Sequence, residues 1–417
     1  MNGRKARTQV KKMLLDHDRA KEMELLYRKQ LLEIMQEWAD HVLDAQYGGY
    51  ATNFDENWKL TGRQKNIWAQ ARQSYMFAAI QTKIDNDSKW GSLSKAGVDF
   101  IVQHAYTGNG RWNYELSEAG TDVLEGTTTI FTDLFVLMAL SEFSLATQTE
   151  QYAGLINETF RAVEANVFDP NFKDIAPHVW EPGVERYSVY MIALNAAMVA
   201  GQVLGQQRVR PFIEKCMDKI LCFFDQNASG FLLESLRADK TIIDTAAGRQ
   251  VTPGHIYEGM WFCMQAAWAL KDNAAMERAS RIIEKTCTRA IDKKHGGIIH
   301  RFDCLGYAPQ DELSTDTGVL RPDDKVDWVQ CESLYAFALQ AAYKNDAASW
   351  NDFLELHDYC QKNFRPPQGG DWYPLLSADG AVLRKNKGGK HRVAFHVPRA
   401  LMNLSLLFHE LARLQAL

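Results

Sequence analysis

The segment H-G-G-I-I-H-R-F, residues 295–302, places two glycines directly before a short strand-like run. Similar segments occur around Gly49, Gly110, Gly230 and Gly370, so the spacings between successive copies are 61, 120, 67 and 73 residues. The longest interval equals about two periods, and it contains D-P-N-F-K-D, residues 169–174. A recurring unit of this length is typical of repeat architectures. We therefore interpret the chain as six degenerate repeats.

Helical patterns occupy the sequence between these segments. Residues 66–80, 129–143 and 333–343 are apolar on more than one helical face, which is typical of helices buried between other helices. Each repeat has room for two helices and a hairpin-like loop. Six such hairpins predict an all-α (α/α)6 barrel with its loops at one end. An open solenoid is the alternative, although it would need polar capping repeats that the sequence does not show.

Composition limits the function classes. The 417 residues carry a formal net charge of −5 and no long block of either sign, which argues against nucleic acid and anionic membranes as partners. Residues 1–24 contain no signal-like apolar stretch, and we expect no later segment to reach about 18 uncharged apolar residues, the usual bilayer-spanning length. We expect a single domain over residues 1–417, in which 1–24 form a charged helical extension. The seven scattered cysteines indicate reduced thiols in a cytoplasmic protein, without a metal site.

The motif T-P-G-H-I-Y-E, residues 252–258, predicts a helix start, with Thr252 as N-cap and Pro253 in the first helical position. His255 then lies in the first turn, where the helix dipole favours a neutral imidazole. Glu258 follows on the same face, and could orient the ring or hold a substrate hydroxyl. The alternative is an ordinary structural histidine.

A second histidine precedes another predicted helix start in F-H-V-P-R, residues 395–399. His396 comes just before Pro398, and Arg399 lies in the first turn, where a cation is electrostatically unfavourable. In an (α/α)6 barrel, alternate helices line the inside and begin at the same end. Two imidazoles from different repeats could then face one pocket, an arrangement suited to proton transfer at a carbon.

Arg72 lies in the helix-forming stretch I-W-A-Q-A-R-Q-S-Y-M-F, residues 67–77, four residues after Trp68. A guanidinium on a helix that is apolar almost all round needs an anionic or strongly polar partner. One interpretation is a buried ion pair with Asp133. The functional interpretation is that Arg72 binds a sugar oxygen or a developing enolate.

Seven segments together carry a resemblance to a known family. They are residues 65–77, 129–135, 185–195, 252–258, 325–333, 370–380 and 387–399, in family order along nearly the whole chain. The chain resembles the N-acylglucosamine 2-epimerase family, and within it the N-acetylglucosamine branch more than the cellobiose epimerase or mannose isomerase branches. Gln330, Cys331 and Ile192 depart from the patterns of individual branches, so the identity of the sugar stays open.

The resemblance implies an (α/α)6 barrel that exchanges a proton at C2 of an open-chain aldose through an enediolate. By resemblance, His255 and His396 are the acid/base pair, Arg72 binds the carbonyl oxygen, and Glu258 is the partner of His255. The resemblance also implies a set of substrate-binding residues, namely Trp68, Asp133, Asn195, Trp328, Glu332, Trp372 and Arg399.

The resemblance implies no metal or other cofactor for the chemistry, and a homodimer is expected. Some relatives depend on ATP as an effector, but G-G-K-H, residues 388–391, lacks the pattern of a phosphate-binding Walker loop. The same residues would also serve an aldose-ketose isomerase, or a mannose or cellobiose epimerase. Two further alternatives are a glycoside hydrolase using Glu258 and Glu332 as its two carboxyl groups, and a protein that only binds a partner.

Overall fold

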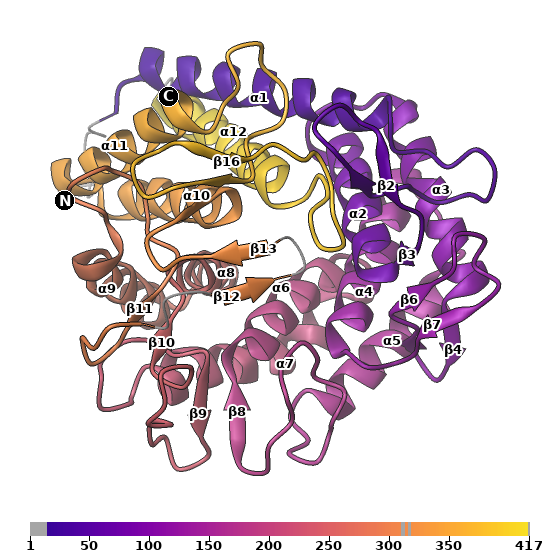
Figure 1. Ribbon diagram of the computed structural model, residues 1–417, viewed down its shortest axis with the longest axis horizontal. Helices are drawn as coiled ribbons and strands as arrows, with labels where there is room; N and C mark the ends of the chain where they lie inside the picture. The colour runs from indigo at the N-terminus through magenta and orange to yellow at the C-terminus, as the bar shows by residue number, and fades with distance from the viewer. Residues whose placement is uncertain (1–14, 310–312, 316–317, 416–417) are drawn as a thin grey trace, which may run out of the picture.

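The computed structural model describes residues 15–309, 313–315 and 318–415 of the chain (Figure 1). Helices dominate the described residues, and a π-helical segment, Lys219–Phe224, continues α7. The helices are α1 (His17–Ala39), α2 (Ile67–Lys83), α3 (Ser88–His104), α4 (Ile130–Thr147), α5 (Ala153–Asn166), α6 (Tyr187–Leu204), α7 (Gln206–Asp218), α8 (Pro253–Leu270), α9 (Asn273–Ala290), α10 (Asp327–Lys344), α11 (Ala347–Asn363) and α12 (His396–Gln415).

The even-numbered helices form an inner ring, and the odd-numbered helices form an outer ring (Figure 1). Inner helices are buried on most sides, as α4 illustrates by burying every residue from Ile130 to Ser144. Outer helices bury one stripe, as in α9, where Ala275, Met276, Ala279 and Ile283 face inward. The burial pattern follows from sequence, because only helices that are apolar all round tolerate an interior position.

The inner ring is closed. Successive inner helices contact each other from α2 to α12, and α12 in turn contacts α2. The outer helix α1 packs against α12, so the first and last helices of the chain form one pair. These contacts confirm the predicted (α/α)6 barrel over the open solenoid, and they explain why the sequence shows no polar capping repeat.

The glycine segments begin the long connections from an outer helix to the next inner helix. Gly49, Gly110, Gly230, Gly297 and Gly370 all have positive φ, between 65° and 85°. Glycine adopts this left-handed conformation at no steric cost, which explains why it recurs at the same place in each repeat. The connections from inner to outer helices are much shorter, so the long loops gather at the end of the barrel where inner helices begin.

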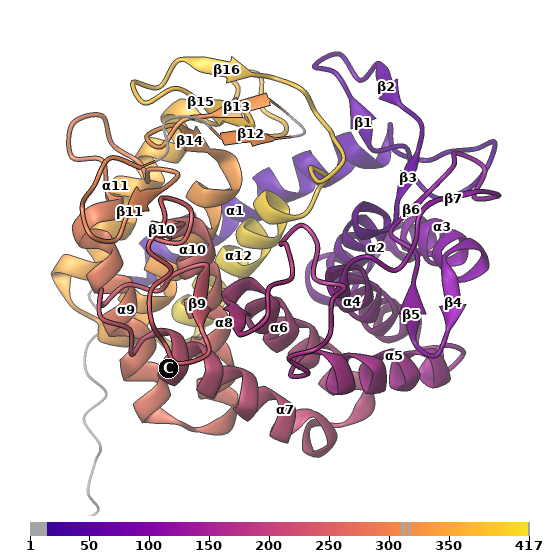
Figure 2. The same ribbon diagram turned by 60° about the horizontal axis from the view of Figure 1, so that its bottom comes forward.

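Short antiparallel strands lie in the loops at this end of the barrel (Figure 2). Most pair in twos, while β3-β6-β7 and β14-β15-β16 form three-stranded sheets, and β3 joins the loops of neighbouring repeats through Lys65 opposite Leu116. The strands are β1 (Asn53–Phe54), β2 (Leu60–Gly62), β3 (Lys65–Asn66), β4 (Tyr106–Gly108), β5 (Arg111–Trp112), β6 (Glu115–Leu116), β7 (Val123–Glu125), β8 (Val184–Arg186), β9 (Ser235–Arg237), β10 (Gln250–Val251), β11 (Phe302–Asp303), β12 (Leu313–Thr315), β13 (Gly318–Leu320), β14 (Lys325–Val326), β15 (Leu375–Leu376) and β16 (Val382–Arg384).

The structure bears on two expectations, the N-terminal extension and the absence of an apolar segment of membrane-spanning length. The expected charged extension, residues 1–24, overlaps the first turns of α1, which is an outer helix of the barrel, and residues 1–14 lie outside the described part. Two inner helices, α4 and α6, are long and apolar enough to span a membrane, contrary to the expectation that no segment is. In this structure they are 83% and 78% buried among other helices, which accounts for their hydropathy.

Candidate active site

The first two turns of four inner helices, α2, α8, α10 and α12, carry most of the residues that the sequence analysis selected. Pro253 occupies the first position of α8, as predicted, and places His255 in its first turn. Trp328 is the second residue of α10, at the same end of the barrel. The last helix, α12, starts at His396 itself, two residues earlier than its Pro398 suggested, so His396 is helical and not merely adjacent to the helix. Closure of the barrel directs these helix starts toward a common axis.

A cavity with about 530 Å³ of open space lies on this axis. That size falls within the range of small-molecule sites. Six of the predicted residues line it, namely Trp68, Arg72, His255, Glu258, Trp328 and His396. The sequence analysis missed other lining residues, including His178, Ser188 and an apolar wall of Phe131, Met191 and Ile192. His178 comes from a loop without a recognisable motif, so its position depends on the fold.

Trp328 lies between the two histidines. Its ring centroid is 5.0 Å from that of His255 and 5.7 Å from that of His396. Both imidazoles line the same cavity, and they come from α8 and α12, on opposite sides of α10. Two imidazoles on either side of the Trp328 ring can contact one small molecule from different directions.

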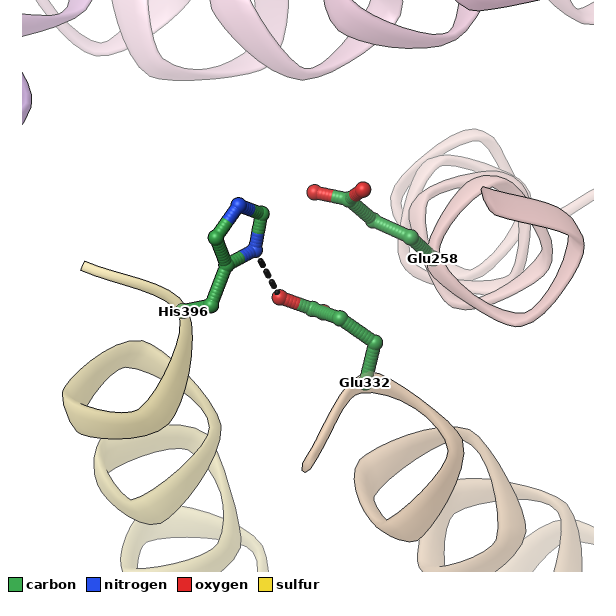
Figure 3. Close-up of side chains that lie close together, drawn as sticks. All are labelled: Glu258, Glu332 and His396. Atoms are coloured by element: carbon green, nitrogen blue, oxygen red, sulfur yellow. Dashed lines mark hydrogen bonds and ion pairs between the residues drawn. The ribbon is translucent and has the colours of Figure 1, made fainter. Parts of the chain in front are cut away.

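Each imidazole is held by a glutamate at one ring nitrogen. His255 Nδ1 lies 2.8 Å from Glu234 Oε1, and His396 Nδ1 lies 2.7 Å from Glu332 Oε1. Because a carboxylate can only accept, the Nδ1–H of each ring is the donor, and this fixes the tautomer of the neutral form. Figure 3 shows that the second nitrogen of His396 points away from Glu332 and Glu258. This nitrogen is therefore the one available for proton transfer.

The structure corrects the predicted partner of His255. Glu258 was expected to orient this ring, but Glu234 does so, and Glu258 bonds the guanidinium of Arg399 instead. Glu234 belongs to the repeat segment S-G-F-L-L-E-S-L, residues 229–236, and lies 21 residues before His255. No local spacing connects the two residues. The only sequence signal that could have identified Glu234 is that it lies in one of the repeated glycine segments.

The two histidines differ in their proton affinity. Burial disfavours the charged form of His255, but the carboxylate of Glu234 outweighs it and raises the pKa of His255 above its ordinary value. Burial lowers the pKa of His396 well below its ordinary value, and the cations Arg72 and Arg399 act in the same direction. The direction of this shift opposes the neutral state expected for His255, because the carboxylate of Glu234 acts against the helix dipole. Environments that push two pKa values apart are typical of acid/base pairs.

Arg399 joins the two buried glutamates beneath the histidines. Its Nη2 donates to Glu258 and, at 2.6 Å, to Glu332 Oε1, while Trp261 Nε1 donates to Glu332 Oε2 at 2.8 Å. One donor atom from each of Glu258, Glu332 and His396 lies within 4.8 Å of the others, a spacing that a metal ion could use (Figure 3). In this structure the guanidinium already supplies the balancing positive charge at both carboxylates.

Arg72 is surrounded by aromatic rings rather than by acids. Its guanidinium carbon lies 4.1 Å from the ring centroid of Phe135, 4.7 Å from that of Phe395 and 5.0 Å from that of Trp68. Among the described residues, Arg72 makes one long hydrogen bond, in which its Nη1 donates to the carbonyl oxygen of His391 at 3.5 Å. Burial lowers its pKa to about 9, so it remains a cation at neutral pH. Arg72 thus offers unused donors to the cavity.

Three predicted substrate-binding residues lie away from this cavity. Asp133 is fully buried and pairs with Arg111 at 2.6 Å, so the alternative of an Arg72–Asp133 ion pair is also wrong. Trp372 is buried against Phe364, with ring centroids 5.8 Å apart. Asn195 faces another cavity at the opposite end of the barrel. Glu332 and Arg399 are positioning residues that reach the cavity through His396 and Glu258.

The active-site cavity continues into an outer compartment. This compartment has about 970 Å³ of open space and shares Arg72, Trp328 and His396 with the inner cavity. Its other walls come from the loops before α10 and α12, including Arg384 and Asn386. Together the two compartments provide more room than a monosaccharide alone requires.

Comparisons with known proteins show which family the chain resembles. The N-acylglucosamine 2-epimerase (GlcNAc 2-epimerase) family model matches residues 48–400. N-acylglucosamine 2-epimerase of Bos taurus is 26% identical over 384 residues, which cover 89% of this chain and 88% of that protein.

Solved structures of similar fold include a cellobiose 2-epimerase from Bacillus thermoamylovorans. Its TM-score is 0.77 at 16% identity, covering 93% of this chain and 99% of that one. A D-mannose isomerase has a TM-score of 0.76 at 18% identity, covering 91% and 97%. At these identities the likeness shows the shared fold. The family model spans most of the chain, and on that ground the chain belongs to the N-acylglucosamine 2-epimerase family, whose members are isomerases.

Proposed function

We propose that this protein inverts C2 of an open-chain aldose, with N-acetylglucosamine and N-acetylmannosamine as its epimeric pair. The observation that carries the proposal is the convergence of His255, His396 and Arg72 on one cavity. The apolar wall of Phe131, Met191 and Ile192 suits the methyl group of an N-acetyl substituent. The family membership and the N-acylglucosamine 2-epimerase relatives support the same choice of sugar.

The reaction follows from the charge states of the three groups. Arg72 binds the C1 carbonyl oxygen and stabilises the negative charge that develops there. Neutral His396 takes the proton from C2, and the electron pair of the C–H bond forms a C1–C2 enolate whose negative charge lies on the C1 oxygen. Protonated His255 then delivers its proton to the opposite face of C2, which completes the inversion. The glutamates hold both rings, and in the reverse reaction the two histidines exchange roles.

The alternative of a glycoside hydrolase fits the geometry less well. Glu258 and Glu332 are almost fully buried and both accept hydrogen bonds from the guanidinium of Arg399, and of the two only Glu258 lines the active-site cavity. Hydrolases need two carboxyl groups that both reach the glycosidic bond. An aldose-ketose isomerase would use the same three residues, and differs only in returning the proton to C1.

Deuterium exchange at C2 tests the proposal directly. The protein is incubated in D2O with N-acetylmannosamine or N-acetylglucosamine, and C2 deuterium and products are followed by NMR. In the wild type we expect exchange together with inversion. His255→Gln and His396→Gln should each lower inversion by about 10²–10⁴-fold. Each variant should still exchange the C2 proton of the one epimer that faces its remaining histidine.

The control is His409→Gln, on the same helix as His396, because this side chain is 54% exposed and far from the helix start. The control should keep wild-type inversion. A ketose product would move the protein to the isomerases. Absence of exchange with either N-acetyl sugar, and with mannose, glucose and cellobiose, would contradict the two-histidine mechanism.

Location and assembly are part of the proposal. All seven cysteines are free thiols, which supports a reducing, cytoplasmic environment. We also propose a homodimer that acts on its sugar without a metal or other cofactor. Activation by ATP is a separate question, for which an assay with and without the nucleotide provides the answer.

A further inference from the structure

A second cavity lies at the opposite end of the barrel, where the inner helices end. We name it the lower cavity, and its walls come from α2, α4, α6, α8 and α12. It has about 710 Å³ of open space, comparable to that of the active-site cavity. Its lining includes six polar or aromatic side chains, those of Tyr75, Lys83, Glu142, Asn195, Trp261 and Arg399.

Two almost buried polar side chains face this cavity without a hydrogen-bond partner among the described residues. Tyr75 is 6% exposed and Asn195 is 7% exposed. Neither the hydroxyl of Tyr75 nor the side-chain amide of Asn195 hydrogen-bonds any described residue. Glu142 is fully buried, and its Oε2 also lacks a hydrogen-bond partner among the described residues. Buried polar groups are nearly always hydrogen-bonded, so the Tyr75 hydroxyl and the Asn195 amide call for a hydrogen-bond partner, which a molecule in the cavity can supply.

The chemistry of the lower cavity favours an uncharged molecule. Lys83 neutralises Glu142, and Arg399 is committed to the two glutamates of the active site. The remaining polar groups are amides and a hydroxyl, which both donate and accept hydrogen bonds. Trp261 adds an aromatic side chain to the wall. Hydroxyl groups on a compact carbon skeleton match this set, whereas a phosphate would find no uncommitted cation.

The lower cavity is separate from the active-site cavity. Arg399 lines the lower cavity and Glu258 lines the active-site cavity, and their ion pair lies between the two. The two cavities share no lining residue. A molecule in one therefore need not displace a molecule in the other.

We propose that the lower cavity is a second binding site, which takes a small uncharged polyhydroxylated molecule of six-carbon size through Tyr75 and Asn195. The site binds independently of the chemistry at the histidines. Its test therefore uses binding alone, and its failure is distinguishable from failure of the proposed epimerase activity.

The test measures binding of radiolabelled D-glucitol and methyl α-D-mannopyranoside by equilibrium dialysis. Neither compound has a free carbonyl group, so neither is a substrate, and together they distinguish an open polyol from a sugar ring. In the wild type we expect one molecule bound per chain. Tyr75→Phe and Asn195→Leu each remove hydrogen bonds, and each should weaken binding by about three- to tenfold.

Filling each cavity locates the bound molecule. Met198 lines the lower cavity and Ile192 lines the active-site cavity. Met198→Trp should abolish binding, whereas the volume-conserving Met198→Leu and the active-site variant Ile192→Trp should preserve it. Far-UV circular dichroism checks that each variant folds. No bound ligand in the wild type, meaning that only water occupies the cavity, would overturn the proposal. Loss of binding in Ile192→Trp but not in Met198→Trp would overturn it equally.

Discussion

Arg399 illustrates at the residue scale how a locally unfavourable side chain can be explained by distant partners. It lies in the first turn of α12, where the helix dipole opposes a cation. Its compensation comes from Glu258 and Glu332, which are 141 and 67 positions away in the sequence. Because Glu332 also holds His396, the guanidinium contributes to the position of the proposed base.

Removing the guanidinium of Arg399 should destabilise the fold. In Arg399→Met two carboxylates remain buried without their partner, so the free energy of unfolding should fall by about 3–5 kcal/mol. Urea denaturation of the variant and the wild type measures the difference. The triple variant Arg399→Met, Glu258→Gln, Glu332→Gln removes the buried charges as well and should recover part of the loss. A change below about 1 kcal/mol in Arg399→Met would contradict the buried cluster.

Glu234 should set the working pH. Because it raises the pKa of His255, Glu234→Gln should lower that pKa and move the alkaline limb of kcat/KM to lower pH. Protonated His255 also stabilises the fold below its ordinary pKa near 6.5, and this stabilisation is lost as pH rises through the raised value. The variant should therefore lose more stability at pH 5.5 than at pH 8.5. The exposed control Glu214→Gln should leave both profiles in place.

At the scale of elements, the inner helices and most of the long loops were predictable from the sequence, because both depend on local chemistry. The glycines with positive φ mark five of the six long loops, and all-round apolar stretches mark inner helices. The sixth loop begins without this glycine, and the doubled spacing together with the segment D-P-N-F-K-D predicted it. The partnership of Glu234 with His255 and the position of His178 were not predictable. Both depend on how a loop folds over a neighbouring helix, which no periodicity encodes.

Gly230 and Gly297 distinguish two costs of replacing a repeat glycine, the cost of a positive φ and the cost of a steric clash. Both Gly230 and Gly297 have positive φ, but an added Cβ meets nothing closer than 3.8 Å at Gly230, whereas it would lie 2.5 Å from the ring of Tyr359 at Gly297. Gly230→Ala should destabilise the fold by about 1–2 kcal/mol. Gly297→Ala should cost about 1–3 kcal/mol more, because the ring must move. Thermal unfolding of both variants measures this difference, and equal losses would refute the steric argument.

At the scale of the whole molecule, the candidate active site exists only because the barrel closes. Arg72 comes from the first inner helix, and His396 comes from the last. The guanidinium of Arg72 donates to the carbonyl oxygen of His391, just before α12, across 319 positions of sequence. The repeat length predicted six units, and their closure into a ring predicted that distant helix starts would meet. Which residue faces which cavity required the structure, as Asn195 and Asp133 show.

Closure also predicts how the protein unfolds. The hydroxyl of Tyr27 on α1 lies 2.6 Å from His357 Nδ1 on α11, and its ring stacks on Phe408 of α12, so Tyr27 ties the first helix to the last repeat. Tyr27→Ala should lower the free energy of unfolding by about 3–5 kcal/mol, as truncation of a buried aromatic residue does.

In a closed ring each inner helix has two neighbours, so this loss should move one cooperative transition to lower denaturant, with circular dichroism and tryptophan fluorescence coinciding. An open array would instead release its terminal repeat first. An early transition in Tyr27→Ala that involves only part of the helical signal would therefore contradict energetic closure of the barrel.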